Sequence, residues 1–89
     1  MEEYEYEMLK LCKKQELTDE DKAYAHKIFT NKMLAVDYDD NIFLMSSAFF
    51  GNSDMIEILK CYDVDINIEE KKAYRLAKQN NNSCMKLLL

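Results

Sequence analysis

The sequence predicts an all-α protein of about three helix–turn–helix pairs, and three features of its 89 residues predict it. The chain has one glycine and no proline, whereas β-rich folds and phosphate-binding loops need glycine-rich turns. Apolar residues recur at spacings of three and four along much of the chain, which is typical of helices with one buried face. Several residues also recur 30 positions later, which indicates a repeated structural unit.

The first predicted helix covers residues 4–14. Tyr4, Met8 and Cys12 lie on one apolar face, and the helix is acidic at its start and basic at its end, as the helix dipole favours. Thr18 is the predicted N-cap of a second helix, because three acidic residues follow it directly. The apolar residues of this second helix continue through Phe29.

Residues 36–41 predict a turn, because Asp and Asn bond to their own backbone and tolerate left-handed conformations. A third helix is expected from Ile42 to Phe50. It should stop at Gly51, since glycine readily takes the left-handed conformation that ends many helices.

Ser53 is the predicted cap of a fourth, strongly apolar helix. Residues 63–67 are expected to be extended or turn-like, and a fifth helix is expected over residues 70–79. The asparagines at 80–82 should end the fifth helix, and Ser83 should cap a last helix that ends at Leu89.

The internal match has a single register. The matched pairs are Ser47 and Ala77, Asn52 and Asn82, Ser53 and Ser83, Met55 and Met85, and Leu59 and Leu89. This register predicts that the stretches 42–60 and 70–89 are consecutive copies of one hairpin of helices, stacked side by side.

The segment from Gly51 to Lys60, with Asp63-Val64-Asp65-Ile66-Asn67 after it, resembles the second half of an ankyrin repeat. That half has a glycine turn, an apolar helix and a closing Gly-Ala-Asp-Val-Asn. Residues 37–41 resemble the turn at the tip of the family's hairpin finger. The sequence departs from the family at residues 42–45, where Thr-Pro-Leu-His is usual, and at Asp63, which must take the left-handed conformation of a glycine.

The resemblance implies a short ankyrin-like solenoid in one domain over residues 1–89. Its parts would be a divergent capping unit at 1–36, the best-matching repeat at 37–68 and a C-terminal partial repeat at 69–89. Such arrays are stabilised by contacts between neighbouring units.

The resemblance also implies a non-catalytic function in protein–protein recognition, through finger tips and inner helices. Phe49 and Phe50 are adjacent, so we expect one to fill the core and the other to be partly exposed. The predicted partner-binding residues are Tyr38, Asp39, Asp40, Asn41, Phe43, Met45, Phe49, Phe50, Ile68 and Glu69.

No pattern in the sequence indicates an enzyme, a cofactor or a metal site. His26 is the sole histidine, and none of the three cysteines has a spacing that pairs it with His26 as nucleophile and base. Zinc sites need closely paired ligands, which are lacking. The acidic turn at 37–41 lacks the mid-loop glycine and the closing glutamate of a calcium loop.

Seventeen acidic and twelve basic residues leave a net charge of −5, which disfavours direct binding to nucleic acid. An acidic surface favours a partner with a basic surface, or it serves solubility alone, which is the commoner reason. The alternative function is a small acidic inhibitor, viral or phage-encoded, that blocks the basic nucleic-acid-binding surface of a larger complex. In that case carboxylates would take the place of phosphates.

The location predicted from the sequence is cytoplasmic, with no membrane partner. The acidic N-terminus lacks the apolar run of a signal peptide, and no apolar stretch approaches the roughly 20 residues that span a bilayer. Three widely spaced cysteines indicate reduced thiols rather than a disulfide framework. A homodimer joined through the C-terminal helix stays open as an alternative, because Leu87, Leu88 and Leu89 are all apolar.

Overall fold

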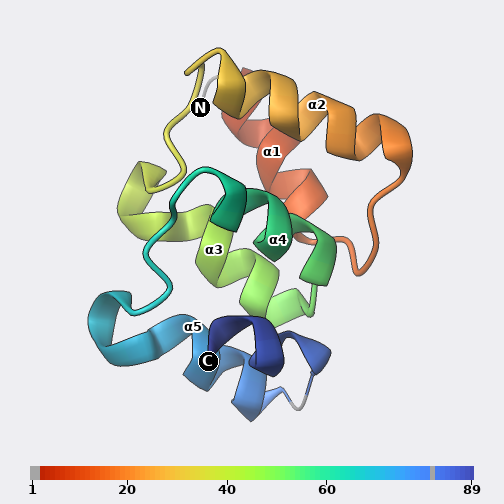
Figure 1. Ribbon diagram of the computed structural model, residues 1–89. Coiled ribbons are helices and arrows are strands. Elements are labelled where there is room, and N and C mark those ends of the chain that lie inside the picture. Colours follow the sequence, from red (N-terminus) through yellow and green to blue (C-terminus); the bar gives the residue numbers. More distant parts are fainter. Residues whose placement is uncertain (1–2, 81) are drawn as a thin grey trace.

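The computed structural model describes residues 3–80 and 82–89, and every regular element in these ranges is helical (Figure 1). The elements are α1 (Glu3–Cys12), α2 (Asp19–Thr30), α3 (Tyr38–Phe50), α4 (Ser53–Cys61), α5 (Ile68–Gln79) and the 3-10 helix η1 (Ser83–Leu88). The all-α prediction is confirmed. Residues 1 and 2 of the predicted capping unit, and residue 81 of the predicted break, lie outside the described residues.

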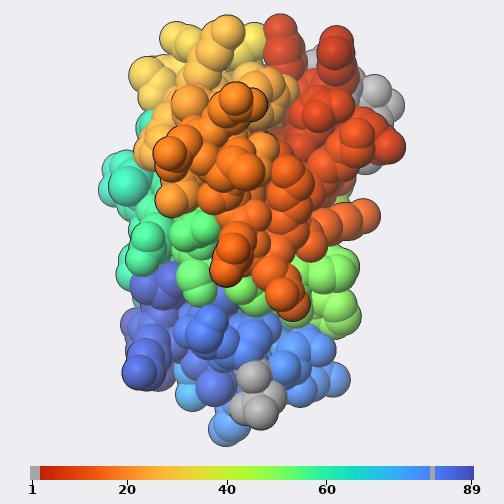
Figure 2. Space-filling model, turned by 90° about the vertical axis from the view of Figure 1, so that its right-hand side faces the viewer, coloured from red at the N-terminus to blue at the C-terminus, as the bar shows by residue number. Residues whose placement is uncertain are grey.

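Consecutive helices pack on each other in three pairs: α1 with α2, α3 with α4, and α5 with η1. Helix α3 also packs between α1 and α5, while α4 packs between α2 and η1. Figure 1 shows the pairs following one another down the molecule, and Figure 2 shows the same order on a face turned by 90°. The molecule measures 30 × 24 × 23 Å.

One apolar core runs through all three pairs. Its fully buried side chains include Met8 and Ile28 in the first pair, Leu44 and Leu59 in the second, and Ala77 and Leu88 in the third. Leu89, one of the leucines on which the dimer alternative was based, is 70% exposed. The core positions follow the three-to-four spacing that an amphipathic helix requires.

The start of α2 follows the sequence prediction. The Thr18 side chain accepts a hydrogen bond from the Asp21 amide at 3.1 Å, and the Asp21 carboxylate accepts one from the Thr18 amide at 3.1 Å. This reciprocal pair is a capping box, which satisfies two amides that the helix itself leaves unpaired.

The predicted caps of the fourth and last helices are wrong by one residue. Asn52 caps α4 by accepting from the Met55 amide at 2.9 Å, and Asn82 caps η1 by accepting from the Cys84 amide at 3.1 Å. Serine and asparagine are comparable caps in isolation, so the second bond of each asparagine, described below, decides the choice. The last element is also a short 3-10 helix rather than an α-helix.

Helices α3 and α5 each include a left-handed turn at their start, so the right-handed part of α3 begins at Ile42, as predicted, and that of α5 begins after residue 71. Asp39, Asp40 and Asn41 have φ values of 50°, 55° and 64°, and residues 69–71 have values of 52°, 55° and 61°. A left-handed residue other than glycine costs roughly 1–2 kcal/mol, and Asp and Asn tolerate it best. The turn predicted at 36–41 is therefore present, and it is joined directly to the helix.

Three helix ends also use left-handed residues. Gly51 ends α3 with φ 75°, as predicted. Asp63 follows α4 with φ 64°, which confirms that an aspartate stands in a glycine conformation there. Lys32 takes the matching place after α2 with φ 55°. The chain thus leaves α2 and α4 through turns of the same kind.

The two capping asparagines also join neighbouring helix pairs. The Asn52 amide donates to the main-chain oxygen of Leu11 in α1 at 2.8 Å, and the Asn82 amide donates to that of Ala48 in α3 at 2.8 Å. Gly51 packs so close to Asn82 that a Cβ atom on Gly51 would lie 3.2 Å from the Asn82 Cβ. One asparagine in each of the second and third pairs therefore both caps its own helix and bonds to the preceding pair.

We expect Asn52→Ala to lower the free energy of unfolding by about 2–3 kcal/mol, because it removes a helix cap and a buried hydrogen bond together. The matched control is Asn80→Ala, since the exposed Asn80 side-chain amide donates to Leu76 of the adjoining helix α5, at 2.9 Å, and to no other helix pair among the described residues. That control should cost less than about 1 kcal/mol. Urea unfolding followed by circular dichroism measures both variants, and equal losses would contradict the joining role of Asn52.

Candidate functional site

The predicted partner-binding residues lie in two places, the left-handed turns that open α3 and α5 and the body of α3. Figure 1 shows the two turns on the same edge of the molecule, because α3 and α5 pack side by side. The sequence prediction that these segments are neighbours depended on the 30-residue register. The structure brings the segments together but does not leave every predicted residue on the surface.

The first turn is partly surface and partly core. Asp39 and Asp40 are exposed, whereas Tyr38 is half-buried. The Tyr38 ring stacks on the Phe43 ring with centroids 5.8 Å apart. Asn41 is 4% exposed, and its Oδ1 atom has no hydrogen-bond partner among the described residues. The side chain of Asn41 therefore lies beneath the turn, where a partner that docks on the turn would not contact it.

Phe43 is fully buried, which corrects its place among the predicted contact residues. Its ring contacts Tyr38 and also lies edge-on to Phe29 of α2, with centroids 6.1 Å apart. Side chains at 43, 44, 47 and 48 form the buried stripe of α3, so Phe43 belongs to the core that anchors the turn.

Phe49 and Phe50 are both exposed, by 46% and 39%, so the expectation that one of them fills the core is wrong. The buried stripe of α3 is already complete at Ala48, and the next two residues fall on the outward side of the helix before Gly51 ends it. The two rings meet edge to face with centroids 5.1 Å apart. Met45, one turn earlier, is half-buried.

The second turn contributes Ile68 and Glu69. Ile68 is half-buried and Glu69 is exposed. The Glu69 carboxylate pairs with Lys72 at 3.4 Å, and its main-chain oxygen accepts a hydrogen bond from Arg75 at 2.8 Å. Lys72 and Arg75 therefore both interact with the first residue of this left-handed turn.

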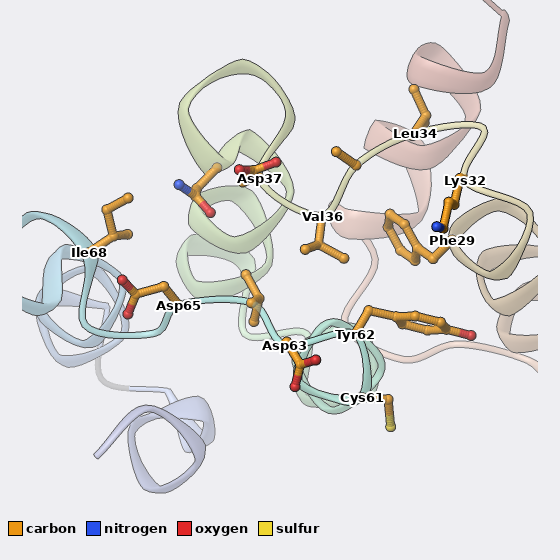
Figure 3. Close-up of a pocket in the computed structure, with 13 residues that line it drawn as sticks. Phe29, Lys32, Leu34, Val36, Asp37, Cys61, Tyr62, Asp63, Asp65 and Ile68 are labelled. Carbon is orange, nitrogen blue, oxygen red and sulfur yellow. The ribbon is translucent and has the colours of Figure 1, made fainter.

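A hollow of about 710 Å³ opens between the chain that follows α2 and the chain that follows α4, and the sequence did not predict it (Figure 3). Its lining residues are Phe29, Lys32, Leu34, Ala35, Val36, Asp37, Asn41, Cys61, Tyr62, Asp63, Val64, Asp65 and Ile68. The sequence signal for it is weak. Each loop follows an outer helix, but only the second loop is acidic, and the hollow exists only once the two helix pairs are stacked.

Tyr62 closes one side of this hollow and is held firmly. Its hydroxyl lies 2.8 Å from His26 Nδ1 and 2.8 Å from Thr30 Oγ1, and its ring lies 5.5 Å from that of Phe29, between centroids. The single histidine thus bonds to a tyrosine between α2 and the end of α4.

The three cysteines differ in their environments. Cys61 is exposed at the rim of the hollow, whereas Cys12 and Cys84 are buried. Burial raises the pKa of Cys12 to about 12, and the nearby Ser47 hydroxyl lowers it in part. Burial also raises the pKa of Cys84. Within residues 3–80 and 82–89, no three His, Cys, Asp or Glu side chains gather as a metal ion would require.

The buried Cys12 thiol makes the stability of the protein depend on pH. Its pKa is about 12 in the folded state against 9.0 for a free thiol, so its stabilising contribution is complete below pH 9.0 and is lost as the pH rises from there. We expect the free energy of unfolding to fall by up to about 1.4 kcal/mol per pH unit in this range. Cys12→Ala should show a shallower fall in urea titrations across the same pH values, and parallel curves for the two proteins would contradict the assignment.

Comparison of this chain with family models, with curated proteins and with solved structures finds no match. None of the helices in the described part of the chain is long and apolar enough to cross a membrane. The exposed side chains and the hollow are therefore the features of the molecule that bear on its function.

Proposed function

We propose that this protein is a non-catalytic module that binds another protein through the exposed residues of α3 and of the two left-handed turns. The exposed pair Phe49 and Phe50 carries the proposal. Two adjacent aromatic rings on the surface of the central helix form an apolar patch, and such patches are enriched in the residues that dominate binding energy at interfaces.

The recognition face is defined by the predicted residues that keep exposed or half-exposed surface. These are Tyr38, Asp39, Asp40, Met45, Phe49, Phe50, Ile68 and Glu69. The apolar members offer buried area to a partner, while the carboxylates favour encounter with a basic surface. Asn41 and Phe43 are left out because they are buried.

The scaffold of this module is a short ankyrin-like solenoid of three helix pairs. Contacts that recur at the 30-residue register support this assignment. Asn52 and Asn82 each cap the helix that follows and each donate to a main-chain oxygen of the preceding pair, and residues 39–41 and 69–71 form equivalent left-handed turns. A stack of this kind holds its surface rigid before binding, which lowers the entropy cost of association.

We expect Phe49→Ser and Phe50→Ser each to weaken partner binding by about tenfold or more, because each removes an exposed aromatic ring from the proposed face. Their melting temperatures should change little, since both side chains lie outside the core. The matched control is Tyr6→Ser, because Tyr6 is a surface aromatic that is 55% exposed and lies on α1.

The measurement is quantitative capture from extracts of the source organism by immobilised wild type and variants. A protein that binds wild type and Tyr6→Ser but is lost from both phenylalanine variants supports the proposal. Equal capture by all four chains would refute this recognition face.

A second candidate function is inhibition of a basic nucleic-acid-binding surface, and the carboxylates of the same edge favour it. Asp39, Asp40 and Glu69 are exposed there, and Asp63 and Asp65 are exposed on the adjoining loop. Carboxylates that stand in for phosphates would make affinity depend strongly on salt.

Salt dependence separates the two functions. If apolar contacts dominate, affinity for the captured partner should fall only a few-fold between about 50 and about 200 mM salt. A mimic that replaces many phosphates should lose about a thousandfold over this range. Titration by calorimetry at several salt concentrations measures the slope, and a steep slope would favour the inhibitor.

A further inference from the structure

We infer that the hollow between the loops after α2 and α4 is a binding subsite for an arginine side chain carried by an extended segment of the partner. The inference deepens the proposed function, and it depends on that function only in taking the occupant to be a protein segment. The hollow lies outside the recognition face except for Ile68, which both share. Its apolar walls, its charge and a lining asparagine with an unpaired acceptor each match a guanidinium on an aliphatic stem.

The walls of the hollow suit the stem of a long basic side chain. Figure 3 shows Val36 and Phe29 directed toward the loop that carries Tyr62. Leu34, Val64 and Ile68 add further apolar lining. Arginine and lysine bury the methylene groups of their side chains along such surfaces while the charged group seeks polar partners.

The charge of the hollow favours a cation. Three carboxylates line it, those of Asp37, Asp63 and Asp65, against the single positive charge of Lys32. Among the described residues, none of the three carboxylates takes part in a salt bridge. Asp65 accepts one hydrogen bond from the Asn67 amide at 2.9 Å, which leaves its second oxygen available. An anionic ligand would meet repulsion here, whereas a guanidinium would find several acceptors.

Asn41 supplies a second, independent observation. It lines the hollow, is 4% exposed, and carries an Oδ1 atom without a partner in the described chain. A buried acceptor without a donor is unfavourable, and most such groups in folded proteins are satisfied. The last torsion of an asparagine is soft, so the amide can turn its oxygen toward a donor placed in the hollow.

Arginine fits this set of acceptors better than lysine does. A guanidinium has five N–H donors in a rigid plane, so it can donate to a carboxylate and to the Asn41 oxygen together. Its flat face also stacks on aromatic rings such as Phe29 and Tyr62, which a compact ammonium does less well. The subsite therefore selects the guanidinium shape as well as its charge.

The test is an NMR titration of the full ¹⁵N-labelled chain with the peptide acetyl-Val-Arg-Val-amide. The control peptide carries citrulline in place of arginine, which keeps the shape and removes the charge. We expect saturable shifts in the amides of residues 31–37 and 61–68 and in the Asn41 side chain. The citrulline peptide should bind about tenfold more weakly or not at all.

A pair of matched variants tests the charges of the hollow. Asp63→Asn with Asp65→Asn removes two negative charges, and asparagine tolerates the left-handed backbone at 63 and can still accept the Asn67 amide. Asp19→Asn with Glu20→Gln removes two negative charges from exposed positions on α2 that lie outside both the hollow and the recognition face. The first double variant should weaken arginine-peptide binding about tenfold, and the second should leave it within about twofold.

The inference is overturned if the arginine peptide causes no saturable shifts at these residues, or if the citrulline peptide binds equally well. Equal losses in the two double variants would reduce the effect to net charge and would also overturn it. The citrulline comparison uses the wild-type chain, so the test stands even where a variant fails to fold. Loss of peptide binding with capture still dependent on Phe49 and Phe50 would refute the subsite alone, whereas the reverse result would refute the recognition face alone.

Discussion

The side-chain amides of Asn52 and Asn82 each bind two helix pairs at once, and the arrangement of the three pairs depends on them. The oxygen of each amide caps its own helix, while the nitrogen donates to a main-chain oxygen of the preceding pair. Both atoms belong to one planar group, so the start of the second helix is fixed relative to the neighbouring pair. Gly51 leaves the space that Asn82 occupies, which a larger residue would narrow.

The same stacking places the strained left-handed residues along the edge for which we propose binding. Left-handed residues other than glycine gather at the turns 39–41 and 69–71 and at Lys32 and Asp63. Each costs free energy that the continuous apolar core offsets. These turns carry the exposed carboxylates, and the loops beside them enclose the hollow. Strained backbone in this protein thus coincides with the surfaces for which we propose binding.

The recognition face and the hollow would contribute differently to binding. Phe49 and Phe50 offer apolar area, which contributes to affinity and depends little on salt. The carboxylates of the hollow would contribute mainly to selection and to the rate of encounter, because charged contacts discriminate between partners more than they add affinity. A partner that uses both surfaces would need an apolar surface and a basic segment, and this requirement narrows the class of proteins to be sought.

Local signals in the sequence determined the helical class, the Thr18 cap, the stop at Gly51 and the left-handed aspartate at 63, because each depends on residues within a few positions along the chain. Only the tertiary structure decided that Phe43 is buried and that Phe49 and Phe50 are both exposed. It also decided that asparagines rather than serines cap α4 and η1, since the bond that favours them comes from another helix pair. The hollow itself belongs to two loops far apart in sequence, so no local pattern encodes it. Capping and periodicity act along the chain, whereas burial and cavities depend on what the neighbouring pair places opposite each residue.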